Sequence, residues 1–292
     1  RLKAQLLGRN QLAYHERALR YRLLPSGYSF EDAIRFVRQA LKQLHPDFAR
    51  ELDLALKTGH IDALPREGKQ GGAACWHNLI KHPTYLMLNF TGEMGDIKTL
   101  GHEFGHYLNN LHMQQACDAL TYGAPTPMAE VASTFIEKYV LQAIAGNLDD
   151  ETRLAIMVSS LDNEVATIFR QSAAMRFEQA LYRSINEQGY LSYQQIGRLF
   201  TQHMSAYLGD AISLTDSDGL WWIYWGHFRK RFYNYSYSFA SLVAKALQTR
   251  LAADPAYIEQ YRRLLSCGRT QRPVDLLASM RLDITTAEVW TL

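Results

Sequence analysis

Apolar side chains between Asp96 and Gln115 recur every three or four positions, which is the period of a helix with one buried face. The residues of this stripe are Ile97, Leu100, Phe104, Leu108 and Leu111. The same spacing, together with capping residues and with Gly and Pro at the ends, predicts further helices. These helices are residues 1–22, 29–45, 47–59, 128–146, 192–208, 233–253, 255–266 and 274–282. Residues 149–188 also keep helical spacing, as one very long helix or as two.

The stretch before the first of these helices has a different pattern. Gly68, Gly71 and Gly72 loosen the chain, and residues 84–90 are rich in strand-forming side chains. We expect a small β-sheet here, with one strand near 72–78 and another at 84–90. A loop is expected much later in the chain, at residues 209–226.

The composition is that of a folded soluble protein. The chain has 292 residues, of which 47% are hydrophobic and 21% charged. A net charge of +2 gives no reason to expect nucleic acid or an anionic membrane as a partner, and no apolar stretch approaches the ~20 residues that span a bilayer. We expect a mainly α fold with a small β component (α+β), in a single domain over residues 1–292. Its parts are a sheet at about 61–91, helices at about 96–146 and a helical remainder at 149–292.

The three cysteines, Cys75, Cys117 and Cys267, are far apart and odd in number. They indicate neither a disulfide framework nor a cysteine zinc site. Idle thiols are typical of a reducing compartment, so we expect the cytoplasm. The first residue is Arg1 and not Met, which suggests a fragment or a processed form.

The helix of residues 96–115 contains the sequence His102-Glu103-Phe104-Gly105-His106. On a helix the two histidines lie one turn apart and about 40° from each other around the axis, so both imidazoles can reach one ion. Glu103 stands beside the same patch, where it can act on a water held by that ion. The pattern is that of a helical zinc site with a built-in base.

A catalytic zinc usually has three protein ligands and one open position, so a third ligand is required. Glu130, which follows His106 by 24 positions near the start of the next helix, is the best candidate. Glu137 lies seven residues further along, on nearly the same helical face. It is expected to orient a liganding imidazole from outside, although a glutamate on a helix is often only solvated surface.

An aromatic stretch at residues 221–237 is the second candidate for chemistry. Hydrolysis of an amide passes through an oxyanion that needs donors besides the metal. A tyrosine hydroxyl or an imidazole N–H suits that role. On residue pattern alone, such a stretch is more often core or interface than catalytic.

Several blocks of the sequence together resemble one family. The blocks are Gly68–Ala73, Pro83–Phe90, His102–His106, Ala129–Glu137, His227-Phe228 and Phe232–Tyr237. In this order they are similar to the oligopeptidase family of zinc metallopeptidases that includes oligoendopeptidase F and thimet oligopeptidase, and closer to the former. The resemblance implies a zincin-like, mostly helical catalytic domain. It also implies a channel that admits short peptides and a sheet edge that binds their backbone.

The same resemblance assigns roles to residues. His102, His106 and Glu130 would hold one Zn²⁺ per chain, with Glu103 as the general base. It also implies that the late aromatic block is functional. His227 and Tyr235 would bind the substrate carbonyl and stabilise the oxyanion, with Tyr233 and Tyr237 as nearby substrate-binding residues.

The sequence departs from the family in two respects. Relatives are usually about twice as long, with an N-terminal helical part that closes the channel and is absent here. Tyr224-Trp225-Gly226 precedes His227, where relatives more often have a proline before the histidine.

The expected function is zinc-dependent endopeptidase cleavage of short oligopeptides. An exopeptidase such as a metallocarboxypeptidase stays possible, with Arg229 or Arg231 holding the terminal carboxylate of the substrate. A non-catalytic peptide-binding module is the alternative from another class, and a purely structural zinc would need four protein ligands. The oligomeric state is not predicted.

Overall fold

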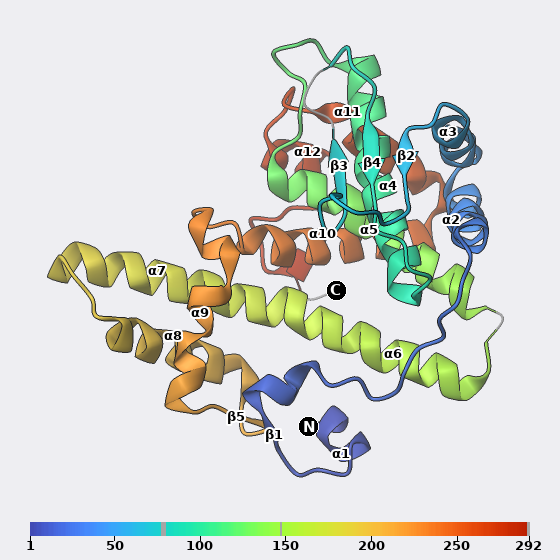
Figure 1. Cartoon of the computed structure of the whole chain (residues 1–292). Coiled ribbons are helices and arrows are strands. Elements are labelled where there is room, and N and C mark those ends of the chain that lie inside the picture. The colour runs from blue at the N-terminus through green and yellow to red at the C-terminus, as the bar shows by residue number, and fades with distance from the viewer. Residues whose placement is uncertain (77–79, 147, 291–292) are drawn as a thin grey trace. The chain divides into compact units, whose positions relative to one another are not determined.

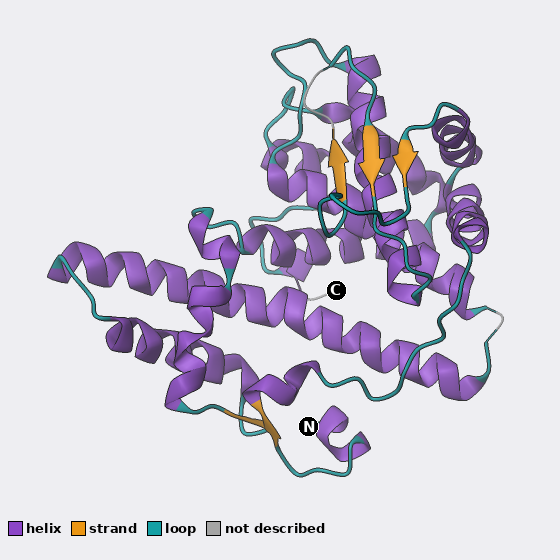
Figure 2. Ribbon diagram, in the orientation of Figure 1, coloured by secondary structure: helices purple, strands orange, loops and turns teal. Residues whose placement is uncertain are grey.

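The computed structural model describes residues 1–76, 80–146 and 148–290. These residues form two compact units: unit 1 is Arg1–Leu23 with Asp150–Phe239, and unit 2 is Leu24–Asp149 with Ala240–Leu292. Helices dominate both units and the strands are short (Figures 1 and 2), which confirms the predicted mainly α fold. The single-domain organisation stays a prediction.

The helices and strands of unit 2 carry the sequence motif. They are α2 (Phe30–Leu44), α3 (Pro46–Lys57), β2 (Ile61–Asp62), β3 (Ala74–Trp76), β4 (Tyr85–Met87), α4 (Met94–Ala116), α5 (Thr126–Ala145), η5 (Pro255–Tyr257), α11 (Ile258–Cys267), α12 (Pro273–Ser279) and η6 (Glu288–Trp290). Helix α10 (Tyr235–Ala253) begins in unit 1 and ends in unit 2.

The start of α2 shows how local sequence sets an element. The Ser29 hydroxyl accepts a hydrogen bond from the Asp32 amide at 3.0 Å, and the Asp32 carboxylate accepts one from the Ser29 amide at 3.1 Å. This reciprocal pair satisfies two amides that have no partner inside the helix. The predicted helix therefore begins where its capping residues stand.

The sheet of unit 2 has the strand order β2-β4-β3. β2 pairs with β4 in parallel, with Ile61 opposite Leu86, and β3 pairs with β4 antiparallel, with Cys75 opposite Leu86. β3 is thus an edge strand, and α4 lies against β3 and β4. The predicted strands near 72–78 and 84–90 are confirmed in part by β3 and β4, which are shorter; residues 77–78 lie outside the described residues.

Helix α11 braces α4 and α5. The Tyr261 hydroxyl donates to the Ala132 carbonyl at 2.7 Å, and the Tyr261 ring stacks on Phe135 with centroids 4.0 Å apart. The Asn109 amide donates to the Leu265 carbonyl at 2.8 Å. Because these contacts are buried, they fix the two helices of the motif against a common support.

Unit 1 is organised around one long helical run. Its elements are α1 (Leu2–Leu6), β1 (Leu12–Ala13), η1 (Tyr14–Ala18), α6 (Asp150–Glu164), η2 (Val165–Arg170), α7 (Gln171–Gln188), α8 (Tyr193–Leu208), β5 (Ile212–Ser213), η3 (Asp216–Leu220), α9 (Trp221–Tyr224) and η4 (Gly226–Arg229). Helices α6 and α7 are continuous through η2, so residues 150–188 form one long helix and not two (Figure 1).

The junction η2 is a π-helical turn. The Ser238 hydroxyl lies 3.2 Å from the Thr167 carbonyl and 3.1 Å from the Ile168 carbonyl, and Ser172 donates to the Ile168 carbonyl at 2.7 Å. These hydroxyls add side-chain hydrogen bonds to the backbone carbonyls of the wider turn.

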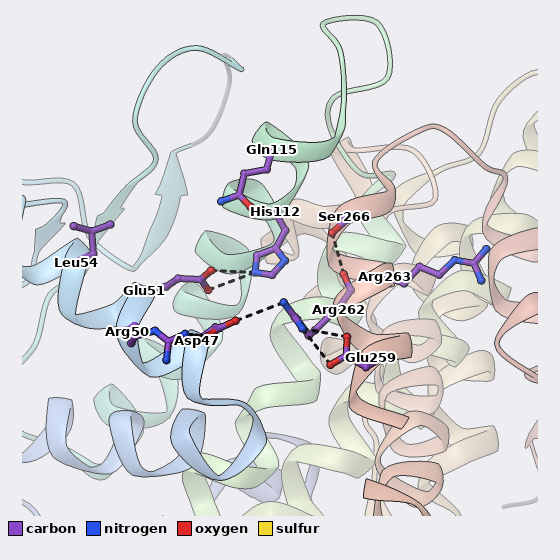
Figure 3. A pocket seen from close by; sticks show the side chains of 10 residues that line it. All are labelled: Asp47, Arg50, Glu51, Leu54, His112, Gln115, Glu259, Arg262, Arg263 and Ser266. Atoms are coloured by element: carbon purple, nitrogen blue, oxygen red, sulfur yellow. Dashed lines mark hydrogen bonds and ion pairs between the residues drawn. The ribbon is translucent and has the colours of Figure 1, made fainter. Parts of the chain in front are cut away.

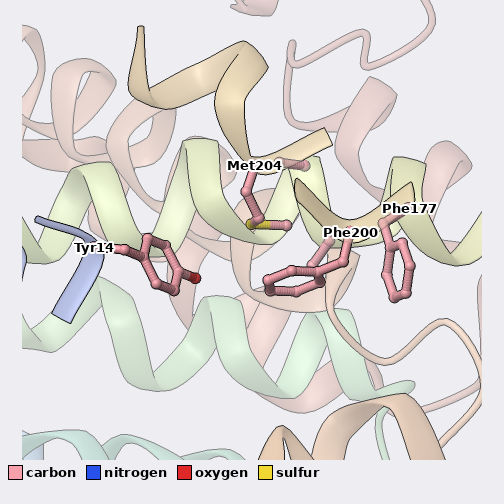
Figure 4. Close-up of a cluster of buried hydrophobic side chains, with 6 residues drawn as sticks. Tyr14, Phe177, Phe200 and Met204 are labelled. Carbon is pink, nitrogen blue, oxygen red and sulfur yellow. The ribbon is translucent and has the colours of Figure 1, made fainter. Parts of the chain in front are cut away.

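The core of unit 1 is a cluster built mainly from α7 and α8. Its buried side chains include Tyr14, Phe177, Phe200 and Met204 (Figure 4). The Phe177 and Phe200 rings meet edge to face with centroids 5.4 Å apart. Phe228 packs on the same cluster and contacts Phe177 at 5.1 Å, so the core reaches into the aromatic stretch that the sequence singled out.

Two expectations about secondary structure were wrong. Residues 1–22 form only a short helix, a strand and a 3-10 turn, because Gly8 takes a left-handed φ of 69° and Leu12 pairs in parallel with Ile212. Residues 209–226 are not one loop, since β5, η3 and α9 lie within them. In both cases long-range pairing or packing overrode the local signal.

Within the described residues, the helices include none that has both the length and the apolar character to cross a membrane.

Candidate metal centre

Helices α4 and α5 approach closely because glycines face α5. A Cβ added at Gly105 would lie 2.5 Å from the Ser133 Cα and 3.0 Å from the Ala132 carbonyl oxygen, and one added at Gly101 would lie 2.7 Å from a methyl group of Val140. No larger side chain fits such contacts without a shift of its neighbours. His102 and His106 each follow one of these glycines, so the close approach brings both imidazoles toward α5.

Three donor groups from the two helices converge. The Nε2 atoms of His102 and His106 lie 3.5 and 3.9 Å from Oε2 of Glu130, and the candidate donor atoms of the three residues are all within 4.8 Å of one another. The two imidazole rings are 4.9 Å apart and nearly perpendicular. Separations of this size are what ligands about 2 Å from a shared ion require.

Glu130 provides a test of whether the site fits a cation. Its Oε2 atom is buried, and among the described residues none donates a hydrogen bond to it. A buried carboxylate oxygen without a partner is costly unless a positive group occupies the space before it. Because this oxygen faces two imidazole nitrogens, the donor set fits a divalent cation of the kind bound by two histidines and a glutamate.

Glu137 holds the other side of His102. Its Oε1 lies 2.6 Å from Nδ1 of His102, and its Oε2 lies 2.7 Å from Nζ of Lys98, which precedes His102 by one turn on α4. A carboxylate on Nδ1 fixes the ring and directs Nε2 toward Glu130. The hydrogen bonds from His102 and Lys98 outweigh the effect of burial and lower the pKa of Glu137 to about 2.

The carboxylates gathered around His102 attract positive charge. Burial raises the pKa of Glu103 and of Glu130, since it disfavours their charged forms. Burial opposes protonation of His102, but the hydrogen bond to Glu137 and the surrounding carboxylates outweigh it and raise its pKa. A proton on His102 or a bound cation can supply this charge. Glu103, only 9% exposed, lies on the same helix between the two histidines.

The late aromatic residues belong to unit 1, and His227 is at their centre. Its ring stacks on Tyr237 with centroids 5.3 Å apart and 28° between planes, and it contacts Tyr233 at 5.2 Å. Trp225 Nε1 donates to His227 Nδ1 at 3.2 Å, so in the neutral ring Nε2 carries the proton and can donate. Tyr235 is 42% exposed at the start of α10. The structure therefore brings His227, Tyr233 and Tyr237 together within this unit.

Several residues of these clusters were not foreseen. Gly101 was not recognised as a helix contact, although a pair of glycines four apart inside a helical pattern is a signal for close packing. Lys98 was also missed, despite its helical spacing of four from His102. Glu178 supports the loop of His227 through a tertiary contact with the Phe232 amide, for which local sequence gives no signal.

A separate hollow of about 590 Å³ lies on unit 2 among α3, α4 and α11 (Figure 3). Its charged side chains largely pair with one another. Glu51 contacts His112 at 3.3 Å, and Arg262 lies 3.1 Å from Glu259 and 3.6 Å from Asp47. Such mutual pairing leaves little field to attract a charged ligand.

The centre has two histidines one turn apart, a glutamate between them and a second glutamate from the following helix, within a mainly helical fold. These features define the class of HExxH metal-binding proteins with a downstream glutamate. Residues 33–291 match Peptidase family M3, and the chain belongs to this family. Because this is a metallopeptidase family, membership implies a metal at the centre. The resemblance to oligoendopeptidase F stated from the sequence is confirmed.

The curated relatives are longer than this chain. It is 28% identical over 264 residues to Oligopeptidase PepF of Bacillus subtilis, which covers 89% of this chain and 39% of the relative. It is 24% identical over 294 residues to Group B oligopeptidase PepB of Streptococcus agalactiae, which covers 99% of this chain and 48% of the relative. The chain thus spans less than half the length of either relative.

Solved structures show the same fold. One, described as PZ peptidase A with an inhibitor, superposes with a TM-score of 0.80 at 17% identity, over 96% of this chain and 50% of that one. At this identity the likeness concerns the fold alone.

Proposed function

We propose that this chain supplies the catalytic part of a zinc-dependent endopeptidase that cuts short oligopeptides at internal bonds. The observation that carries the proposal concerns Oε2 of Glu130. This atom is buried, accepts no hydrogen bond from the described residues and faces the Nε2 atoms of His102 and His106. Membership of Peptidase family M3 and the name oligopeptidase of the curated relatives support the substrate class.

His102, His106 and Glu130 would hold the zinc, and Glu137 fixes the His102 ring through its Nδ1 atom. When bound, the ion would polarise a substrate carbonyl and lower the pKa of water. Glu103 accepts the proton of the attacking water and delivers it to the leaving amine. Its upward-shifted pKa suits a group that must both take and return a proton near neutral pH.

The remaining roles fall to unit 1 and to the sheet. His227, through Nε2–H, and Tyr235, through its hydroxyl, donate hydrogen bonds to the oxyanion, while Tyr233 and Tyr237 contact the substrate. The edge strand β3 offers backbone groups to an extended peptide. We also propose a cytoplasmic location, because Cys117 and Cys267 form no disulfide although the chain carries three cysteines.

The exopeptidase alternative needs a cation that can hold a terminal carboxylate. Arg229 donates to the Trp225 carbonyl at 3.1 Å and to the Ile223 carbonyl at 2.7 Å, so its guanidinium is already engaged. This leaves Arg231 as the exposed candidate. Mapping the cut positions in a ten-residue peptide separates the two activities, because an exopeptidase removes only terminal residues.

The decisive experiment couples metal content to cleavage. Purified protein should contain one zinc per chain, cleave a quenched peptide, lose cleavage with a chelator and regain it with Zn²⁺. The Glu103→Gln variant should retain zinc and lose cleavage by roughly 10²–10⁴-fold, the usual contribution of general acid–base catalysis. Cleavage by this variant at the wild-type rate would exclude Glu103 as the base. Zinc binding without cleavage by the wild-type chain would favour a peptide-binding module.

A further inference from the structure

A buried carboxylate in unit 1 contacts the loop that carries His227. Glu178 on α7 is 1% exposed, and its Oε1 accepts a hydrogen bond from the Phe232 amide at 2.8 Å. Among the described residues its second oxygen, Oε2, has no hydrogen-bond partner and is buried. Its neighbour Phe177 contacts Phe228, so two consecutive residues of α7 contact the chain at two points just after His227.

The bonded residue has an unusual backbone. Phe232 has a φ of 53°, in the left-handed region that a residue with a large side chain rarely adopts. A conformation of this kind persists only where surrounding contacts determine it. The hydrogen bond from its amide to Glu178 and the contact of its ring with Tyr182, with centroids 5.4 Å apart, are two such contacts.

Asn234 links the carboxylate to the histidine. It is fully buried. Burial raises the pKa of the Glu178 carboxyl and lowers the pKa of the His227 imidazole, and the nearby Asn234 amide opposes both shifts. Neither amide atom makes a hydrogen bond of good geometry with the described residues. The polar groups therefore run from the buried Glu178 and Asn234 to the partly buried His227, whose ring stacks on Tyr237.

Stability alone does not account for a carboxylate at this position. A buried acid with one backbone partner is costly, and an apolar side chain of similar volume would fill the core at lower cost. What an apolar side chain lacks is an acceptor for the Phe232 amide. What Glu178 provides and an apolar residue would not is therefore an acceptor that holds the backbone conformation at Phe232.

We propose that Glu178 is a positioning residue that locks the turn at Phe232–Asn234 and thereby sets the orientation of His227. The catalytic meaning of this orientation rests on the proposed function, in which His227 donates to the oxyanion. The positioning itself does not rest on the proposed function, because it concerns the backbone conformation at Phe232 and the surroundings of the His227 ring within unit 1.

The test compares substitutions at Glu178 by NMR. Glu178→Gln keeps an acceptor oxygen and should preserve slow hydrogen exchange at the Phe232 amide. Glu178→Met removes the acceptor at similar volume and should speed that exchange by about tenfold, the effect of one hydrogen bond of ordinary net strength. The His227 titration should move upward toward its ordinary value in Glu178→Met, because a loosened loop relieves the burial that lowers its pKa.

Gln171→Met is the matched control. Gln171 lies on the same helix seven residues earlier and is also buried, at 7% exposed. This variant should leave both the Phe232 exchange and the His227 titration unchanged. Equal changes in Gln171→Met and Glu178→Met would mean general loosening of the core and would overturn the proposal. So would a folded Glu178→Met with wild-type exchange and titration.

Glu178→Asp covers the case in which Glu178→Met does not fold. It keeps the carboxyl group but is one methylene shorter, so it should also lose protection at the Phe232 amide; retained protection would overturn the proposal. In peptide cleavage, Glu178→Met should lower kcat roughly ten- to hundredfold with zinc content unchanged, while Glu178→Gln stays near wild type. If the wild-type chain cleaves no peptide, the proposed function fails while the NMR comparison still decides the role of Glu178.

Discussion

Replacement of Gly105 by alanine tests the claim that the metal centre depends on backbone contact between α4 and α5. The added Cβ would stand 2.5 Å from the Ser133 Cα, about 0.9 Å inside the 3.4 Å at which ordinary contact begins. The opposing atoms belong to the backbone of α5, so no side-chain rotation relieves the overlap. The helices must separate or bend.

The magnitude follows from overpacking. Extra methyl groups in a well-packed core cost about 1–3 kcal/mol, and a backbone clash belongs at the upper end. A gain of up to ~1 kcal/mol in helix propensity from Gly to Ala offsets part of this cost. We expect a net loss of about 1–2 kcal/mol in the free energy of unfolding. Metal affinity should also fall, because Glu130 moves away with α5.

The assay compares three Gly→Ala variants on α4, which differ in how closely the added Cβ approaches its neighbours. In Gly95→Ala the new Cβ meets nothing within 4 Å, so stability and metal affinity should be unchanged or slightly higher. In Gly101→Ala it meets a methyl group of Val140, which can shift, so the loss should be intermediate. Urea unfolding and competition for Zn²⁺ measure the two quantities. The reasoning is refuted if Gly105→Ala matches Gly95→Ala in both.

Three shorter predictions follow. Glu137→Ala should weaken Zn²⁺ affinity by roughly 10–100-fold in a chelator competition, because the imidazole it orients loses its partner; unchanged affinity would remove Glu137 from the centre. Hydrogen bonds from Arg66 and Lys69 lower the pKa of Asp62 to about 2, so the stabilisation by this exposed carboxylate is present above its unfolded pKa of about 3.9 and is lost as pH falls through about 2. An NMR titration of Asp62 with a midpoint near 3.9 would contradict this. Phe177→Ala should cost about 3–5 kcal/mol in urea unfolding, since a fully buried ring leaves a cavity, and a loss below 1 kcal/mol would contradict the core assignment.

The sequence predicted the elements whose signals are local. The helix predicted at 96–115 from its apolar period is confirmed as α4, and the helix predicted after the capping residues at Ser29 is confirmed as α2. Glu130 could be proposed as a ligand because the motif required a third donor within reach. The convergence of Glu130 with His102 and His106 depends on the close contact of Gly105 with α5. This contact is a feature of helix packing and does not follow from the spacing of residues in the sequence.

What could not be predicted is tertiary in origin. The helix expected over residues 1–22 is broken because Leu12 pairs with Ile212, a partner far along the chain. The left-handed backbone at Phe232 has no sequence signal, because phenylalanine is among the residues least expected there. The contacts that hold it come from a buried glutamate and a tyrosine, both far away in the sequence.

The π-helical turn at Val165–Arg170 determines the rotational register of the long helix in unit 1. One residue more or fewer in a helix rotates everything beyond it by about 100°. A single-residue deletion that restored regular α-helix here would therefore rotate α7 about the helix axis by this angle relative to α6. It would carry Phe177 and Glu178 off the loop that they hold, without changing either side chain. The number of residues in the π-helical turn thus affects the surroundings of His227 as much as the identity of any residue in that turn.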